Sequence, residues 1–163
     1  MNVSARRRRR CLVSAPALAL LIASAGCSSA DEAAKPVVPT PDSKVTELCR
    51  NLHKQLPDKV DGLERADPEP ESELTAGWGD PAIILRCGVA KPPEMNNPEA
   101  DGVTVDGVNW LLEEQDDGSF RFTSTLRKAY VEITLPEERA GGGVGPLTDF
   151  AAPMKKAIPK GIA

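Results

Sequence analysis

The first hydrophobic pattern along the chain is an apolar run without periodicity. Residues 11–26, CLVSAPALALLIASAG, carry no charge, and five arginines at positions 6–10 precede them. Secretory signal peptides have this order: a basic head, then a short apolar run, then small residues at the end of the run. The run of 16 residues is shorter than the roughly 20 that a membrane-spanning helix needs. We therefore predict that residues 1–26 are a signal peptide.

Helical periodicity first appears after residue 43. Apolar residues recur there at spacings of three and four, which places one buried face on a helix: Val45, Leu48, Cys49, Leu52 and Leu56. Ser43 is suited to cap the start of this helix, and Pro57 would end it. The segment that follows, residues 58–73, holds seven acidic residues and two prolines. Its composition predicts a solvated loop.

From residue 81 the period changes to two, which indicates half-buried β-strands. Residues 82–88 alternate in this way, and we expect them to form a strand at a sheet edge. Asp106-Gly107 is the preferred centre of a tight hairpin turn, and Asp116-Asp117-Gly118 marks a second turn. Strands are predicted around these turns at residues 103–105, 109–114, 120–126 and 130–135. Short strands with tight connections favour an antiparallel meander.

Helical spacing returns near the C-terminus, at Leu147, Phe150, Ala151, Met154 and Ile158. Pro153 lies inside this series and lacks a backbone N–H, so we expect the last helix to be kinked or split there. The order of elements predicts an α+β fold. It would have an antiparallel sheet of about five strands, with an N-terminal and a C-terminal helix packed on one face. Residues 44–163 are of a suitable size for one domain.

Four stretches of the chain carry a resemblance to a known family: residues 77–81 (GWGDP), 85–88 (LRCG), 106–111 (DGVNWL) and 144–149 (VGPLTD). Together they resemble a family of exported actinobacterial proteins and lipoproteins known as domain of unknown function 3515. The resemblance covers roughly residues 44–163. It implies an extracytoplasmic setting, and it implies no activity, cofactor or catalytic residue.

The end of the apolar run carries two overlapping processing signals. Ser24-Ala25-Gly26-Cys27 resembles a bacterial lipobox, in which the cysteine is lipidated and becomes the mature N-terminus, although Leu is commoner than Ser24 in that pattern. Two acyl chains on Cys27 would anchor the protein stably at the outer face of the cell membrane. The alternative is ordinary cleavage after Ala25 and secretion without a lipid. Residues 27–43 contain three prolines and are predicted to form a flexible, lipid-anchored stalk.

Removal of residues 1–26 takes away five of the 20 basic residues and none of the 24 acids, which leaves a net charge of −9. An acidic body repels nucleic acid and anionic lipid headgroups. We therefore expect no nucleic-acid partner. Contact with the membrane would depend on the lipid anchor alone.

Cysteine and histidine are scarce in the predicted domain. Cys49 lies on the helical stripe and Cys87 on the inward face of a strand, so in an oxidising compartment a disulfide between them is the favoured interpretation. Two separate buried thiols are the alternative. His53 is the only histidine, and a single histidine does not supply the three or four ligands of a zinc site. We predict neither a metal nor a cofactor, and no catalytic residue.

Trp78, with Asp80 as its polar neighbour, is the strongest candidate for a partner-binding surface. It lies between Gly77 and Gly79 and precedes Asp80-Pro81, which is a loop composition, and aromatic residues on loops often take part in recognition. The alternative is that Trp78 folds back and plugs one end of the core. Trp110 lies in mid-strand, and we expect it in the core. We expect a non-enzymatic accessory or binding protein whose partner is an envelope protein or ligand. The alternative is an enzyme that acts on cell-wall material with two carboxylates.

Overall fold

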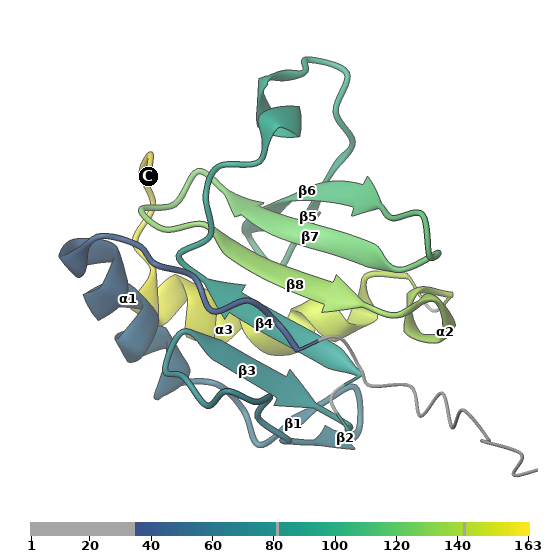
Figure 1. Cartoon of the computed structure of the whole chain (residues 1–163). Helices are drawn as coiled ribbons and strands as arrows, with labels where there is room; N and C mark the ends of the chain where they lie inside the picture. The colour runs from purple at the N-terminus through teal and green to yellow at the C-terminus, as the bar shows by residue number, and fades with distance from the viewer. Residues whose placement is uncertain (1–34, 81, 142) are drawn as a thin grey trace, which may run out of the picture. The chain divides into compact units, whose positions relative to one another are not determined.

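The computed structural model describes residues 35–80, 82–141 and 143–163. In this part of the chain an antiparallel six-stranded sheet packs against helices, which confirms the predicted α+β class (Figure 1). The predicted signal peptide and the predicted lipidation site, Cys27, lie outside the described residues. No helix in the described ranges is long and apolar enough to cross a membrane.

The first helix, α1 (Ser43–His53), begins one residue before the predicted start and ends three residues before the predicted end at Leu56. Its cap is Asp42 and not Ser43, because the Asp42 carboxylate accepts hydrogen bonds from the backbone N–H groups of the next turn at 2.8 and 3.0 Å. Leu56 is buried, but it lies beyond the end of the helix. Pro57 disfavours the helical conformation in the residue before it, so the chain leaves the helix earlier than the stripe indicates.

The predicted loop at residues 58–73 contains a small hairpin. Strands β1 (Lys59–Val60) and β2 (Leu63–Glu64) pair across Asp61 and Gly62, whose φ angles are 49° and 75°. Asp-Gly is a preferred pair for such a turn. The prediction of a loop was wrong here because two-residue strands are too short to show a period.

The main sheet has the strand order β3-β4-β8-β7-β6-β5, with every neighbouring pair antiparallel. Its strands are β3 (Thr75–Trp78), β4 (Ile83–Cys87), β5 (Gly102–Val105), β6 (Val108–Glu114), β7 (Phe120–Thr125) and β8 (Val131–Leu135). The predicted meander is confirmed for β5 to β8. The predicted edge position of the strand at residues 82–88 is wrong, because β4 lies between β3 and β8. The sequence did not predict β3, since its glycines indicated a loop.

The remaining elements are short, apart from the last helix. They are the 3₁₀ turns η1 (Pro93–Asn96) and η2 (Gly145–Leu147) and the helices α2 (Glu137–Ala140) and α3 (Thr148–Ala157). Helix α3 runs through Pro153 as one element, so the predicted split is absent. Pro153 removes a single backbone hydrogen bond, and its ring is buried in the core, where apolar contacts offset that loss.

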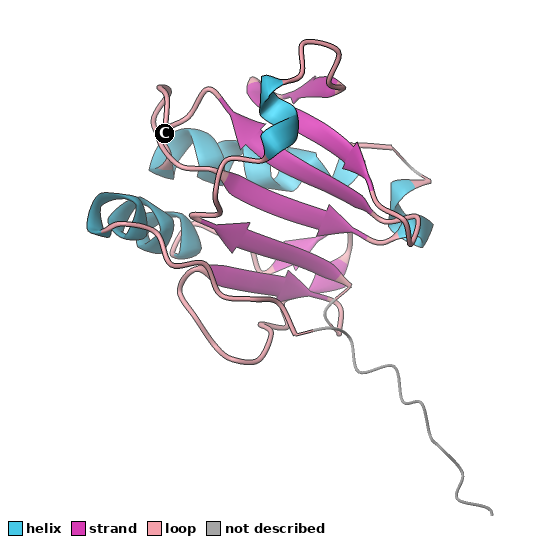
Figure 2. Ribbon diagram, turned by 45° about the horizontal axis from the view of Figure 1, so that its top comes forward, coloured by secondary structure: helices cyan, strands magenta, loops and turns pink. Residues whose placement is uncertain are grey.

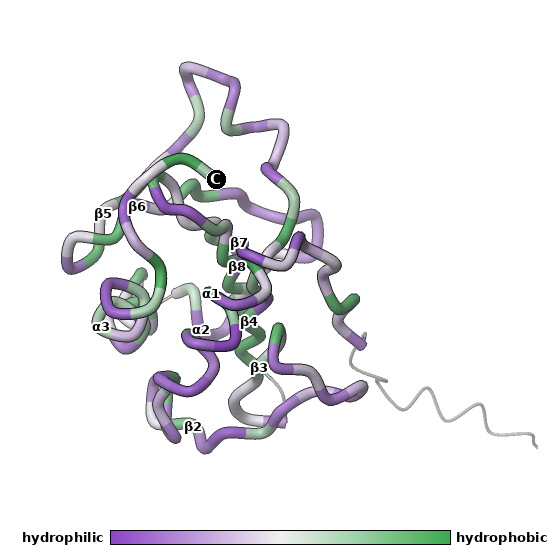
Figure 3. The backbone as a smooth tube through the Cα atoms, turned by 90° about the vertical axis from the view of Figure 1, so that its left-hand side faces the viewer, coloured by the Kyte–Doolittle hydropathy of each residue, from purple (hydrophilic) through white to green (hydrophobic). Residues whose placement is uncertain are grey.

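The core lies between the sheet and the two long helices. The alternation of β4 turns Ile83, Leu85 and Cys87 inward, and α1 packs against α3 beneath the sheet. Cys87 is bonded to Cys49 of α1, with 2.01 Å between the sulfur atoms, which confirms the predicted disulfide. Trp110 is also buried, as predicted. Figure 3 shows α3 on one side of the sheet and the N-terminal segment on the other.

Candidate functional site

The sheet face opposite α3, here called the outer face, carries charged side chains in a row. Strand alternation directs one charged residue outward from each of four adjacent strands: Arg86 (β4), Glu132 (β8), Arg121 (β7) and Glu113 (β6). Arg86 lies directly opposite Glu132 in the strand register, and Arg121 lies opposite Glu113. Opposite charges in such cross-strand positions attract one another.

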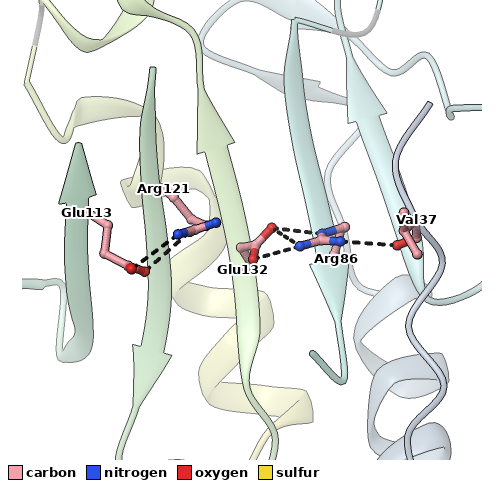
Figure 4. A network of polar contacts seen from close by, with 5 residues as sticks. All are labelled: Val37, Arg86, Glu113, Arg121 and Glu132. Carbon is pink, nitrogen blue, oxygen red and sulfur yellow. Dashed lines mark hydrogen bonds and ion pairs between the residues drawn. The ribbon is translucent and has the colours of Figure 1, made fainter. Parts of the chain in front are cut away.

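Each arginine of this row binds a carboxylate with two nitrogen atoms (Figure 4). Arg86 donates from Nε to Glu132 Oε1 at 2.8 Å and from Nη2 to Oε2 at 2.9 Å. Arg121 donates from Nε and Nη2 to the two carboxylate oxygens of Glu113 at 3.3 and 3.2 Å. Two-pronged contacts of this kind fix the orientation of both side chains. The row is therefore a rigid, charge-balanced strip across the outer face.

Glu132 is the most deeply placed carboxylate of the row, with 7% of its surface exposed. A buried carboxylate without a partner is costly, so Arg86 is needed to hold the Glu132 charge in place. Directly opposite Glu132 on β7 lies Thr123, which is fully buried and whose hydroxyl has no hydrogen-bond partner in the structure. The centre of the outer face is therefore covered by other parts of the chain.

One covering segment is the last part of the predicted stalk, residues 35–42. The Val37 carbonyl oxygen accepts a hydrogen bond from Arg86 Nη1 at 3.3 Å. Pro41 packs so closely on Gly88 that a Cβ atom there would lie 2.6 Å from the proline ring. Gly88 also has a φ angle of 85°, which favours glycine. This end of the predicted stalk thus contacts the folded domain.

The second covering segment, residues 91–101, borders an apolar groove. Figure 2 shows its short η1 turn in front of the sheet. The groove measures about 490 Å³, which is within the usual range of ligand sites, and residues 161–163 form part of its wall. Its apolar lining includes Met95, Leu111, Leu126, Tyr130 and Ile162. Leu126 and Ile162 are 63% and 87% exposed, so apolar surface is available to a partner.

An acidic hollow of about 430 Å³ adjoins the groove and shares Ala100 and Asp101 with it. Among the described residues that line it, Arg121 is the one basic residue, and it is already paired with Glu113. The acids of the hollow are Glu94, Glu99, Asp101, Glu113, Glu114 and Asp116. The outer face therefore combines an apolar groove with a negatively charged neighbour.

A comparison with protein families matches residues 11–162 to the family described as protein of unknown function (DUF3515). The match spans almost the whole sequence. The chain belongs to this family. No curated protein and no solved structure matches the chain.

In this DUF3515 protein, Trp78 is a core residue and not a surface binding residue. It is fully buried, and its indole Nε1 donates a hydrogen bond to the Pro57 carbonyl oxygen at 3.0 Å. Its ring meets the Phe150 ring edge-on, with 5.2 Å between the centroids. The prediction that Trp78 binds a partner was therefore wrong, and the alternative of a core plug is correct. Asp80 is exposed at the turn after β3, away from both the groove and the hollow.

His53 takes part in a polar cluster that links α1 to β2 and β3. Its Nε2 accepts a hydrogen bond from Arg65 Nη2 at 3.1 Å, since a guanidinium only donates. Arg65 also donates to Asp67 at 2.8 Å and stacks over the Trp78 ring at 5.6 Å. Burial, and then the neighbouring Arg65 charge, lower the pKa of His53 below its usual value. This protein thus uses its one histidine as a neutral hydrogen-bond acceptor.

Metal binding finds no support in the part of the chain that the structure describes. Over residues 35–80, 82–141 and 143–163, no group of three or more His, Cys, Asp or Glu side chains is placed to hold a metal ion.

Sequence reasoning missed the charged row of the outer face. Its signal was present, because each of the four residues occupies an outward position in an alternating strand.

Proposed function

We propose that this protein is a lipoprotein of the cell envelope, and that its folded domain is a non-enzymatic binding module. Cys27 would hold it at the outer face of the cytoplasmic membrane, and the outer face of the sheet would receive a partner. The observation that carries the proposal is the apolar groove beside the acidic hollow on that face. The signal-peptide pattern and the Cys49–Cys87 disulfide support an oxidising, extracytoplasmic location.

Binding is favoured over catalysis by the state of the two carboxylates of the charged row. A carboxylate enzyme needs two acids that are free to exchange protons or attack a substrate. The two partly buried acids of the row, Glu113 and Glu132, each accept two hydrogen bonds from an arginine. These two-pronged contacts occupy both carboxylates, so neither is free to act on a substrate.

The proposal is tested by photo-cross-linking in cells that express the full chain with a cross-linking amino acid at Leu126. Leu126 lines the groove and is exposed, so we expect one defined adduct in the membrane fraction. The same substitution at Glu47 is the control, because Glu47 is exposed on α1 outside the groove. When Cys27→Ala is combined with the cross-linking residue at position 126, we expect the protein and its adduct to be found in the medium and not in the membrane fraction.

Two results would contradict different parts of the proposal. Equal cross-linking from Leu126 and Glu47, or none from Leu126, would remove the outer face as the binding surface. Retention of the Cys27→Ala protein in the membrane fraction, or a mature N-terminus without a lipid mass, would remove the lipid anchor.

A further inference from the structure

Strand β5 forms an open edge of the main sheet. Within the described residues its only strand partner is β6. The N–H of Leu112 donates to the carbonyl oxygen of Asp101 at 2.9 Å, just before β5 begins. Because hydrogen-bonded pairs alternate along an antiparallel ladder, Val103 also bonds to β6. Gly102 and Thr104 therefore direct their backbone N–H and C=O groups toward the open edge.

This edge lacks the side chains that usually prevent pairing with another chain. Natural edge strands are commonly protected by lysine, proline or inward-pointing charge. The sequence of β5 is Gly-Val-Thr-Val, which contains none of these. Gly102 and Thr104 are exposed, and Gly102 has no side chain that would keep an approaching backbone away. Unpaired backbone groups of this kind recognise another extended polypeptide backbone.

The groove and the acidic hollow both meet at this edge. Residues 100–104 line the apolar groove, and Ala100 and Asp101 also line the hollow. In an added strand, side chains would alternate between the two sheet faces, so every second one would face the groove side. The acids of the hollow would attract basic side chains and repel acidic ones.

We propose that an extended, positively charged segment of a partner polypeptide adds to β5 as a seventh strand. Its backbone pairs with Gly102 and Thr104, an apolar side chain enters the groove, and basic side chains lie against the acidic hollow. This inference rests on the proposed binding function and specifies the chemistry of the partner. Three features of the same edge carry it: the free backbone groups, the apolar lining and the negative charge.

The test uses two fluorescent synthetic peptides, one of alternating Lys and Val and one of alternating Glu and Val, with the purified full chain in a non-ionic detergent. Anisotropy should show binding of the Lys-Val peptide that weakens with added salt, and no binding of the Glu-Val peptide. Thr104→Pro removes one edge N–H and spares the backbone bonds to β6, although it also removes the hydrogen bond from Thr104 Oγ1 to Asn109 Oδ1. Affinity should fall roughly fivefold to tenfold. Glu99→Lys should weaken binding several-fold, whereas the matched control Glu47→Lys should not.

A second measurement keeps the test valid if Thr104→Pro unfolds the domain. In the unaltered protein, the Lys-Val peptide should slow hydrogen exchange at the amides of Gly102 and Thr104. The inference is overturned by absence of binding at millimolar Lys-Val peptide, by equal binding of both peptides, or by unchanged exchange at these two amides. If cross-linking from Leu126 in cells persists in that case, only this inference fails and the proposed binding function stands.

Discussion

Trp78 joins more parts of the molecule than any other single side chain described above. Its ring lies against Phe150 of α3, its indole N–H reaches the Pro57 carbonyl oxygen, and Arg65 stacks over it. These contacts tie β3 to the last helix, to the segment after α1 and to the residue that follows β2. The residue that seemed suited to a partner by its glycine neighbours therefore serves the stability of the domain.

Replacing Trp78 by alanine should lower the free energy of unfolding by about 3–5 kcal/mol, because it leaves a large cavity and an unpaired carbonyl oxygen. Trp78→Phe keeps an aromatic ring and should cost less. Denaturant unfolding followed by circular dichroism measures both changes. The exposed Leu126→Ala should change stability by no more than about 0.5 kcal/mol. A loss below about 1 kcal/mol for Trp78→Ala would contradict the core assignment.

We expect His53 to make the domain sensitive to mild acid. The folded protein holds it neutral, since protonation of Nε2 would remove the hydrogen bond from Arg65 and place two positive charges side by side. Its pKa is lowered on folding, first by burial and then by the Arg65 charge. The unfolded chain therefore takes up a proton near pH 6.5 before the folded chain does. The contribution of neutral His53 to stability is full above pH 6.5 and is lost as the pH falls below that value.

We expect the free energy of unfolding to fall between pH 7.5 and pH 5.5, and this fall to become smaller in His53→Gln. Glutamine keeps an acceptor for Arg65 but does not titrate. Urea unfolding at several pH values in this window measures the effect. An equal decrease in the two proteins would show that other groups cause the acid sensitivity.

At the scale of elements, the Cys49–Cys87 disulfide joins α1 to the sheet. It closes a loop with a sequence separation of 38 residues that contains the small hairpin and β3. Both cysteines are almost fully buried, so the bond lies within the core. The helix is thereby held against the inner face of β4 even when the loop between them moves.

Loss of this disulfide in Cys87→Ser should lower the free energy of unfolding by about 4 kcal/mol in the chain-entropy model. That is a large part of the 5–15 kcal/mol of a typical domain. Thermal unfolding with and without a reductant provides the comparison. Reductant should destabilise the unaltered protein and leave Cys87→Ser unchanged. Free thiols in native protein purified without reductant would contradict the bond.

Elements with a strong local signal were predictable from the sequence. The apolar stripe predicted α1, and the Asp106-Gly107 turn, with φ angles of 46° and 80°, marked the β5–β6 hairpin. Strand β3 was missed because Gly77 and Gly79 suggest a loop, although Gly77 lies within the strand and only Gly79 belongs to the turn. Its place at the edge depends on pairing with β4, which no local pattern reveals.

At the scale of the whole molecule, the candidate site depends on strand order and register. Arg86 and Glu132 lie 46 positions apart in the sequence, and they meet only because β4 pairs with β8. The groove likewise combines residues 91–104 with residues near 126 and 162. Charge alternation marked the outward positions, but nothing in the sequence showed which of them would be neighbours.

The same strand order governs when the domain finishes folding. Strand β4 ends at residue 87, but its partner β8 begins only at residue 131, and the helix that covers Trp78 ends at residue 157. During synthesis the chain emerges from the ribosome N-terminus first. Strand β4 therefore has an unpaired edge, and the core around Trp78 stays uncovered, until nearly all of the chain has emerged. Contacts between distant segments also form slowly. The topology thus delays completion of the fold until α3 has emerged.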